Sequence, residues 1–589
     1  MISSIVPVIR ALLCPAKPTV IRYAGLLLFL FAYTLTAQQV GGLPSLMLAW
    51  RFEIPLLLYL YFYFNLITRP SRFQVLIAAL PIVMAYVIFD TYHVLFGRLL
   101  RFTEVTELPE MFLVMPILNK ILLFLVVGVP LGLFLRSVQW RRFRPLVWGA
   151  VPLLVLVVAA EGFPAFFMGA FERTQKPIDW MSDTKSAGIN GRIGMALYNE
   201  ARRLICLEKT LAYRGNVRFL RAYDEVVDKV KGAKTKGNVH LIVLESFFDP
   251  TLLRKARFSR NPAHPSFEAL FKGKGGLSVS PVFGGATAQA EFEVLCGVPA
   301  MRELSGIEFD VFTGAKTFCL PNILAQGGYH AIATNAFYPE FFNSTNAYAG
   351  LGFENIYYPK EYAPGFDTYF STGDVTDEFF MYDGQLFSQN LAFVADWIKA
   401  NPGRPLLNYI MTVYGHTPHL TNTNKRPKVI EISGMGKFRD NLLELAVNQY
   451  YYRTEVIAAY VKELIRIDPQ SIIILVSDHL PPLAYGPNTY RDLNYLGKAD
   501  GYIHLNRIYI VENGRAVHYD TIHHYDVPRI ILSYVTQAKF NQTFALKGDA
   551  RDTRIGLSAL REQYMTIMAH AMDGKPVFSG FGHRDAHAN

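Results

Sequence analysis

The chain has 589 residues, of which 51% are hydrophobic and 18% are charged. This length exceeds one ordinary domain, and the apolar content exceeds that of a purely soluble protein. The formal net charge is +10, but no Arg/Lys-rich run with interleaved aromatic residues accompanies it, so we expect no nucleic-acid partner. Because the long apolar stretches lie almost entirely before residue 170, the sequence predicts a membrane part followed by a soluble part.

Five apolar stretches are predicted to cross the membrane as helices, since about 20 apolar residues span roughly 30 Å of hydrocarbon. They cover residues 21–38, 52–66, 75–96, 111–135 and 145–167. The second is the weakest of them, because Arg51, Glu53 and Pro55 crowd its start. The first has no small-residue cleavage site, so we interpret it as a span and not as a removable signal peptide.

The distribution of basic residues predicts the orientation, because short cytoplasmic loops retain positive charge. Basic residues collect before the first span, between the second and third, and between the fourth and fifth. They are Arg10, Lys17, Arg22, Arg69, Arg72, Arg136, Arg141, Arg142 and Arg144. With the N-terminus inside and an odd number of spans, we expect a multi-pass protein of the cell membrane whose soluble domain faces the periplasm or the outside.

Asp90, Lys120 and Glu161 lie within or near the predicted spans, where a charge is costly. Two interpretations are open. The side chains pair between helices or reach the interface, or they form a polar path for a lipid head group.

The soluble part has two predicted sections and a tail. Residues 171–236 are predicted to be a helical linker, because apolar positions recur there at helical spacing. Residues 237–570 alternate strands with helices, which favours a mostly parallel sheet covered by helices on both faces. The expected strands are 239–245, 329–335, 405–413 and 471–477, and the expected helices are 289–295, 320–327, 386–400 and 441–466. Residues 1–170 form the membrane domain, and 571–589 the C-terminal tail.

Two of the predicted strands end in potential metal ligands. HLIVLESF leads to Glu245, and SIIILVSDHL leads to Asp478 and His479. Ligands of such sheets bind beyond the carboxyl ends of the strands, so we expect these three side chains to meet. A third strand, 405–413, is followed by His416 and His419.

Thr287, in GGATAQAEFE, adds a hydroxyl to this predicted site. It follows two glycines and opens a predicted helix. An N-cap is the commonest role for threonine there. Together with Glu245, Asp478 and His479, however, it predicts a site for one divalent cation with three oxygen ligands and one imidazole. Manganese is the favoured ion, with magnesium and zinc as alternatives. Metal coordination lowers the pKa of a hydroxyl enough for it to attack phosphorus.

The order LESF, GGATAQAEFE, GHTPH and SDH resembles the alkaline phosphatase and sulfatase superfamily. Within it, the chain is most similar to the membrane-anchored lipoteichoic acid synthase and phosphoglycerol transferase group, whose members have five transmembrane helices and an extracellular catalytic domain. The resemblance implies that Glu245, Thr287, Asp478 and His479 bind the metal and that Thr287 becomes phosphorylated. It also implies that His416 contacts the substrate, at the phosphate group or as a proton donor to the leaving oxygen.

The resemblance also implies a reaction. A phosphoglycerol head group would leave a membrane phospholipid and pass to a glycan or glycolipid acceptor through a phosphothreonine intermediate. Two alternatives are a phosphoethanolamine transferase of the same superfamily and a catalytically inactive, lipid-sensing membrane protein. The closing segment of the family's catalytic domain resembles TIHHYDVPRIIL here. For His523, His524 and Asp526 we favour packing and capping roles.

The sequence departs from this group in one segment. Where lipoteichoic acid synthases line the glycerol phosphate pocket with a His and a Trp-x-Arg segment, this chain offers Asn335, Phe342 and Ser344. The sulfatase branch is disfavoured, because its Cys/Ser-x-Pro-x-Arg motif is absent and the nearest match, at Cys319, lacks the arginine.

The chain has four cysteines. Cys14 is expected on the cytoplasmic side, and Cys206, Cys296 and Cys319 in an oxidising compartment. Cys296 and Cys319 flank a short segment beside the expected site. We predict that they form a disulfide; the alternative is two buried thiols.

Overall fold

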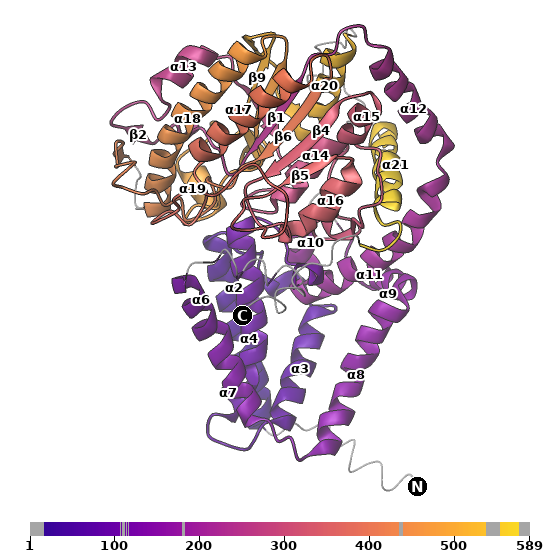
Figure 1. Ribbon diagram of the computed structural model, residues 1–589. Helices are drawn as coiled ribbons and strands as arrows, with labels where there is room; N and C mark the ends of the chain where they lie inside the picture. The colour runs from indigo at the N-terminus through magenta and orange to yellow at the C-terminus, as the bar shows by residue number, and fades with distance from the viewer. Residues whose placement is uncertain are drawn as a thin grey trace. The chain divides into compact units, whose positions relative to one another are not determined.

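The computed structural model describes residues 17–105, 108, 112, 115, 117–178, 183–434, 440–537 and 554–576. Its contacts define two compact units, Met1–Ile205 and Cys206–Asn589, which Figure 1 shows in indigo to magenta and in magenta to yellow. The boundary falls within one helix, α11 (Arg192–Thr210). Arg10 and Cys14 lie outside the described residues, as do most of the predicted tail and the beginning of the fourth predicted span.

The first unit is helical. Its helices are α2 (Lys17–Gln39), α3 (Glu53–Ile67), α4 (Gln74–Phe96), α6 (Ile117–Leu123), α7 (Val129–Ser137), α8 (Phe143–Gly162), α9 (Pro164–Thr174), α10 (Asp183–Asn190) and α11. A π-helical turn, Phe124–Gly128, joins α6 to α7. Among the described residues, four helical segments are long and apolar enough to cross a membrane: Ile21–Gln39, Gln74–Phe96, Ile117–Ser137 and Phe143–Gly162. Their length and composition indicate a multi-pass membrane protein.

The second predicted span forms a helix with bounds within one residue of the prediction, but this helix is not among the four that are long enough to cross a membrane. α3 has 15 residues and therefore rises about 22 Å, which is short of the roughly 30 Å hydrocarbon thickness. Its start is fixed by Glu53, whose buried carboxylate accepts hydrogen bonds from the backbone N–H groups of Arg192, Ile193 and Gly194. A carboxylate that is held in this way fixes where the helix begins.

The fifth predicted span, 145–167, is divided. α8 ends at Gly162 and α9 begins at Pro164, with Phe163 in a non-helical conformation (φ −135°, ψ 54°) between them. Proline fits the first position of a helix because its missing N–H would have no partner there. The apolar run is thus continuous in sequence but not in structure.

Asp90 is buried and paired within the first unit. Its Oδ1 accepts hydrogen bonds from Nη2 of Arg192 at 2.7 Å and from the backbone N–H of Leu43 at 3.0 Å. Arg192 also lies over the ring of Tyr86, 4.7 Å from its centroid. For Asp90, these contacts agree with pairing between segments.

The second unit is built on a mixed, mostly parallel sheet. The strands are β1 (Val239–Leu244), β3 (Gly276–Val279), β4 (His330–Asn335), β5 (Asn355–Tyr357), β6 (Leu406–Met411), β8 (Ile472–Ser477), β9 (Leu505–Glu512), β10 (Arg515–Val517) and β11 (Ile522–His523). Their order is β11-β3-β9-β8-β1-β6-β4-β5, with β10 beside β9. β9 runs antiparallel to β8, β3 and β10, and the other pairs are parallel. A separate ribbon pairs β2 (Arg257–Phe258) with β7 (Ile432–Ser433).

Helices cover both faces of this sheet. They are α12 (Val217–Gly232), α13 (Pro265–Phe271), α14 (Thr287–Cys296), α15 (Leu320–Gln326), α16 (Ser344–Leu351), α17 (Asp383–Ala400), α18 (Asn441–Ile467), α19 (Pro487–Asp492), α20 (Val527–Thr536) and α21 (Arg554–Ala571). Figure 1 shows α13, α17 and α18 on one side of the sheet and α14, α15 and α20 on the other. Every residue of β1, β6 and β8 is buried, as expected for central strands enclosed on both faces. The eight elements predicted between 239 and 477 are present, each end within three residues.

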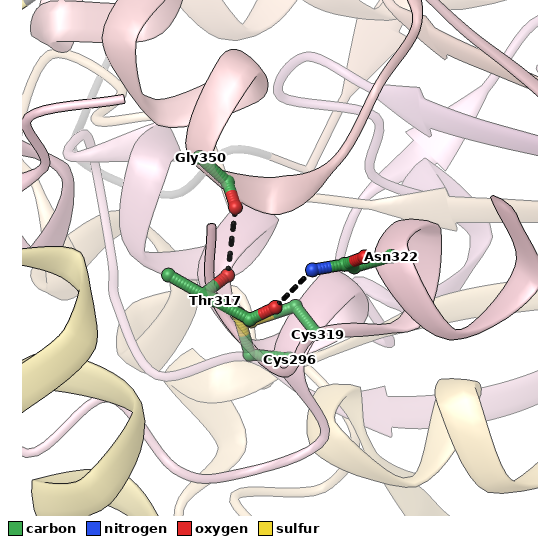
Figure 2. Close-up of a disulfide and its surroundings, with 5 residues drawn as sticks. All are labelled: Cys296, Thr317, Cys319, Asn322 and Gly350. Carbon is green, nitrogen blue, oxygen red and sulfur yellow. Dashed lines mark hydrogen bonds between the residues drawn. A yellow bond between two sulfur atoms is a disulfide. The ribbon is translucent and has the colours of Figure 1, made fainter. Parts of the chain in front are cut away.

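Cys296 and Cys319 form a disulfide, so the disulfide prediction is confirmed and the two-thiol alternative is wrong. Cys296 is the last residue of α14, and Cys319 directly precedes α15. Figure 2 shows the bridge beside Thr317, whose hydroxyl donates to the backbone oxygen of Gly350 and whose backbone oxygen accepts from the side chain of Asn322. The bridge therefore ties the end of α14 to the neighbouring helix.

Candidate active site

The candidate site lies at the carboxyl edge of the parallel strands. β8, β1, β6 and β4 are neighbours in that order and run in the same direction. Glu245 directly follows β1, and Asp478 and His479 directly follow β8. Because strand ends in a parallel sheet are level, these two predicted ligand groups lie side by side.

Glu245, Asp478 and His479 form a buried group in which one ligand atom of each lies within 4.8 Å of the others. Nε2 of His479 is 3.3 Å from Oδ2 of Asp478 and 4.0 Å from Oε1 of Glu245. The hydroxyl of Thr287 completes the group. Its Oγ1 is 2.9 Å from Asp478 Oδ2, 3.1 Å from Glu245 Oε2 and 3.5 Å from His479 Nε2. The structure thus brings together the four residues that the sequence singles out as ligands.

Thr287 is not an N-cap. It is the first residue of α14, and the cap position is Ala286, which has a left-handed conformation (φ 63°) and no side-chain cap bond. The preceding Gly284 and Gly285 also have positive φ, 73° and 150°, a region that glycine enters without a steric penalty. The N–H of Gly284 donates to the carbonyl of Leu480. This turn points the Thr287 hydroxyl at the acids instead of at its own helix.

Backbone hydrogen bonds orient Asp478. Its Oδ1 accepts from the N–H groups of Ser246 and His479 at 2.7 and 2.6 Å, which leaves Oδ2 to face Thr287. Ser246 also donates its hydroxyl to Oε1 of Glu245 at 2.7 Å. Each carboxylate is therefore held in one orientation before any ligand is considered.

The imidazole of His479 is oriented as a metal ligand. Its Nδ1 lies 3.1 Å from the carbonyl oxygen of Leu480. Because a carbonyl only accepts, the hydrogen-bond network assigns the proton to Nδ1. Nε2 then presents its lone pair to the carboxylates and to Thr287.

Burial raises the pKa of both carboxylates. It raises the pKa of Asp478 to about 6. It also raises the pKa of Glu245, which the neighbouring Asp478 raises further and the imidazoles of His479 and His416 oppose. Two carboxylates in one buried site repel each other, and a divalent cation removes this repulsion. Three oxygen ligands and one imidazole nitrogen suit such a hard or borderline cation, so the residues fit one divalent metal ion.

Arg453, on α18, supports the site but carries no recognisable sequence signal. It is buried, and its Nη1 donates to the backbone oxygen of Glu245 at 2.7 Å while its Nε donates to Oδ2 of Asp383 at 2.7 Å. Thr412 accepts from the N–H of Glu245 at 3.0 Å. The backbone of Gly415 packs so closely on Glu245 that a Cβ at this position would lie 1.8 Å from the carbonyl oxygen of Glu245. These contacts fix the backbone that presents Glu245.

His416 lies five residues beyond β6, at the same edge of the sheet. It is half-buried, and its Nδ1 donates to the carbonyl of Thr417 at 2.8 Å. Its ring centroid is 5.0 Å from that of Phe380. His419, in contrast, is buried and contacts Gln449, and burial lowers its pKa to about 3. His419 is therefore packed as a structural side chain.

His523, His524 and Asp526 pack and cap. His523 and Asp526 form a reciprocal capping box at the short helix His524–Asp526. His524 is buried, with Nε2 3.2 Å from the hydroxyl of Ser278, and burial lowers its pKa to about 3.

The segment that departs from the resembling group uses its polar groups internally. Asn335 donates to the hydroxyl of Tyr348 at 3.0 Å and accepts from the N–H of Phe337 at 2.9 Å. Ser344 donates to the carbonyl of Pro339 at 3.0 Å. Both side chains are buried, so they serve the loop after β4.

The fold and the site together define an enzyme of the alkaline phosphatase and sulfatase superfamily. The chain matches the Sulfatase family over residues 237–535, slightly more than half of its length, and it belongs to this family. Cys319, the nearest match to a formylglycine motif, is in the disulfide (Figure 2).

Comparison with individual proteins finds distant relatives. The chain is 27% identical over 261 residues to the "Putative cyclic beta-1,2-glucan modification protein" of Rhizobium meliloti (strain 1021), covering 43% of this chain and 37% of that protein. The chain thus matches little more than a third of this curated relative. Two solved structures are also similar to part of the chain. The phosphoglycerol transferase GacH of Streptococcus pyogenes, in complex with sn-glycerol-1-phosphate, has a TM-score of 0.45 at 18% identity and covers 61% of this chain and 92% of its own. The lipoteichoic acid synthase LtaP of Listeria monocytogenes has a TM-score of 0.39 at 15% identity and covers 53% and 77%.

Proposed function

We propose that this chain is a membrane-anchored, metal-dependent transferase that moves a phosphoglycerol head group from a phospholipid to a hydroxyl of a glycan or glycolipid. The observation that carries the proposal is the placement of the Thr287 hydroxyl, within 3.5 Å of Asp478, Glu245 and His479. The common capping role of threonine does not apply here, because Thr287 is the first residue of α14 and Ala286 holds the cap position. The motif order described above and the family membership support phosphoryl transfer as the chemistry.

Thr287 is the nucleophile of the proposed first step. The Thr287 hydroxyl loses its proton to solvent and its oxygen forms a bond to phosphorus. The bond from phosphorus to the diacylglycerol oxygen breaks, and the leaving oxygen takes a proton from Nε2 of His416. When bound, a divalent cation would lower the pKa of the Thr287 hydroxyl and would neutralise charge on the phosphoryl oxygens. Glu245, Asp478 and His479 would hold it, with manganese favoured by the ligand set.

In the second step an acceptor hydroxyl attacks the phosphothreonine. The bond from the acceptor oxygen to phosphorus forms, the bond to Thr287 breaks, and the proton of the acceptor passes to His416, which is thereby restored. The N–H groups that open α14 face the phosphoryl group in both steps, where a helix N-terminus favours negative charge. The name of the Rhizobium relative supports a glycan as the acceptor.

For the membrane part we propose five crossings: the four long helical segments and, as the second in chain order, the shorter helix α3. Parity decides the side of the catalytic domain: four crossings from an inside N-terminus leave it inside, and five leave it outside. The Cys296–Cys319 disulfide supports the outer side, because such bridges persist in oxidising compartments. We retain residues 1–170 as the membrane domain, 171–236 as the linker, 237–570 as the catalytic domain and 571–589 as the tail.

The test is to find what becomes attached to Thr287. The purified full-length protein is incubated in detergent with head-group-labelled phosphatidylglycerol or phosphatidylethanolamine, and the peptide that carries Thr287 is analysed by mass spectrometry. We expect a phosphoglycerol adduct, and none in Thr287→Ala. An adduct from phosphatidylethanolamine alone would replace the proposed head group. Turnover that survives in Thr287→Ala would refute the mechanism.

Metal removal is a second test. Dialysis against a chelator should abolish formation of the adduct, and manganese should restore it. Substituting Asp478→Asn should lower metal affinity in equilibrium dialysis. A matched change at Asp374, an exposed carboxylate on the surface, should leave it unchanged.

A further inference from the structure

A cluster of aromatic rings lies beside His416 and has no assigned role. Phe337 is its centre, with ring centroids 4.9 Å from Tyr338, 4.8 Å from Phe341, 5.9 Å from Tyr362 and 6.1 Å from Phe380. Phe337 and Phe380 are buried, and the other three rings are half-buried. We call these five residues the aromatic cluster.

The aromatic cluster follows β4 at the same edge of the sheet as the candidate site. β4 pairs in parallel with β6, with Asn335 opposite Met411, and β6 pairs in parallel with β1. The residues after β4 therefore emerge next to those after β6, which include His416. Phe380 joins the two groups, because its ring is 5.0 Å from the imidazole of His416. His416 follows β6, which lies beside β1, the strand that leads to Glu245.

The chemistry of the cluster is that of flat, amphipathic rings. Tyr338 and Tyr362 are stacked, with centroids 4.3 Å apart and planes at 26°. The polar groups of the adjoining loop, Asn335 and Ser344, are engaged within the loop. Aromatic faces bind C–H groups, and tyrosine hydroxyls exchange hydrogen bonds with a polar rim. A sugar ring has both features, with axial C–H faces and equatorial hydroxyls. An acyl chain would need no hydroxyls and would fit branched aliphatic side chains, of which the cluster has none.

We propose that the aromatic cluster is the acceptor subsite and that it binds a sugar ring of a glycan whose hydroxyl attacks the phosphothreonine. This inference rests on the proposed function and names the place and the chemical class of its second substrate. The cluster contributes to the second half-reaction and not to the first. Its rings hold the sugar so that one hydroxyl lies near His416.

The experiment separates the two half-reactions. Adduct formation at Thr287 from labelled phosphatidylglycerol reports the first, and transfer of the label to a linear β-1,2-linked glucan oligosaccharide reports the second. The variants are Tyr338→Leu, Tyr362→Leu and their double substitution, which keep apolar volume but remove the flat face. Tyr338→Phe and Tyr362→Phe keep the face. Phe379→Leu is the matched control, since Phe379 is 59% exposed and directly precedes Phe380.

The Leu variants should form the Thr287 adduct at the wild-type rate and show a KM for the oligosaccharide raised up to about tenfold for each ring, which is the fold-change for a stacking contact of about 1.4 kcal/mol. The Phe variants should retain most of the affinity, and Phe379→Leu all of it. Wild-type transfer kinetics in the double Leu variant would overturn the inference. So would a selective loss of adduct formation, which would assign the rings to the lipid donor.

Binding of the oligosaccharide can be measured directly, whether or not the proposed reaction takes place. Calorimetric titration of the full-length, metal-loaded protein with the same oligosaccharide should show binding that the double Leu variant weakens. Absence of a Thr287 adduct in the wild-type protein would refute the proposed function alone. Absence of oligosaccharide binding in the wild-type protein would refute the subsite.

Discussion

Replacing Glu291 offers the sharpest test of how α14 is held. Glu291 lies one helical turn beyond Thr287 and is buried. Its Oε2 accepts hydrogen bonds from the hydroxyls of Tyr348 at 2.5 Å and Tyr409 at 2.7 Å. Tyr348 accepts in turn from Asn335. The helix that carries the proposed nucleophile is therefore tied to β6 and α16 through one carboxylate.

Glu291→Leu removes the shared acceptor and leaves two tyrosine hydroxyls buried without it. Each unsatisfied group costs about 1–3 kcal/mol, so the variant should lose about 4 kcal/mol of stability. Glu291→Gln keeps a neutral acceptor oxygen in the same place and should lose about 1 kcal/mol at pH 5, the value of one hydrogen bond.

The pH dependence has a definite sign. Burial raises the pKa of Glu291 from its ordinary value of 4.5 to about 7. The folded state therefore binds the proton more tightly than the unfolded state. The associated stability is fully present below pH 4.5 and is lost as the pH rises towards 7. The loss is about 3 kcal/mol, at 1.36 kcal/mol for each pH unit. Gln does not titrate, so Glu291→Gln lacks this dependence.

The assay is thermal unfolding of the full-length protein in detergent, followed by circular dichroism between pH 5 and pH 8. Taking the difference in melting temperature between wild type and Glu291→Gln at each pH removes the contribution of the other titrating groups, which both proteins share. This difference should favour the wild type at pH 5 and shrink or reverse at pH 8. A constant difference, or a Glu291→Leu variant that melts with the wild type, would refute the reasoning.

Two further predictions concern the surroundings of the site. Gly415→Ala places a Cβ 1.8 Å from the Glu245 carbonyl oxygen and 2.2 Å from the guanidinium of Arg453. The substitution should cost about 3 kcal/mol of stability and reduce the metal affinity measured by equilibrium dialysis. Gly215→Ala, with no atom within 4 Å of its Cβ, should change neither quantity. Cys296→Ser opens a bridge between residues 23 positions apart, which should cost about 3 kcal/mol and lower the melting temperature to that of the reduced wild type; a wild type whose melting is insensitive to reductant would contradict this.

The core of the second unit could be predicted from its sequence because its central strands are buried on both faces. β1 and β8 consist of continuous apolar runs, and a parallel sheet brings the ends of such runs to one edge. The antiparallel half of the sheet was not predicted. β9, LNRIYIVE, mixes polar and apolar residues, and its place between β8 and β3 depends on pairing with distant segments.

The membrane part shows the limit of hydropathy. The apolar content of 52–66 predicted a span, and a helix of the same length forms one residue further on, but 15 residues are short of the membrane thickness. Its first residue, Glu53, accepts hydrogen bonds from the start of another helix, more than 130 residues further along the chain. Apolar composition indicates burial in lipid or protein, and only the tertiary contacts decide where a helix begins.

The sequence by itself determined which chemical groups gather at the candidate site. Glu245, Asp478 and His479 follow strands whose ends must coincide, so their meeting is a consequence of the strand pattern. Tertiary structure alone decided the direction of the Thr287 hydroxyl, the support of Glu245 by Arg453, and the engagement of Asn335 within its own loop. The reason is physical: a strand pattern is local and repeats along the chain, whereas the orientation of a buried polar group depends on partners that only folding brings within hydrogen-bond distance.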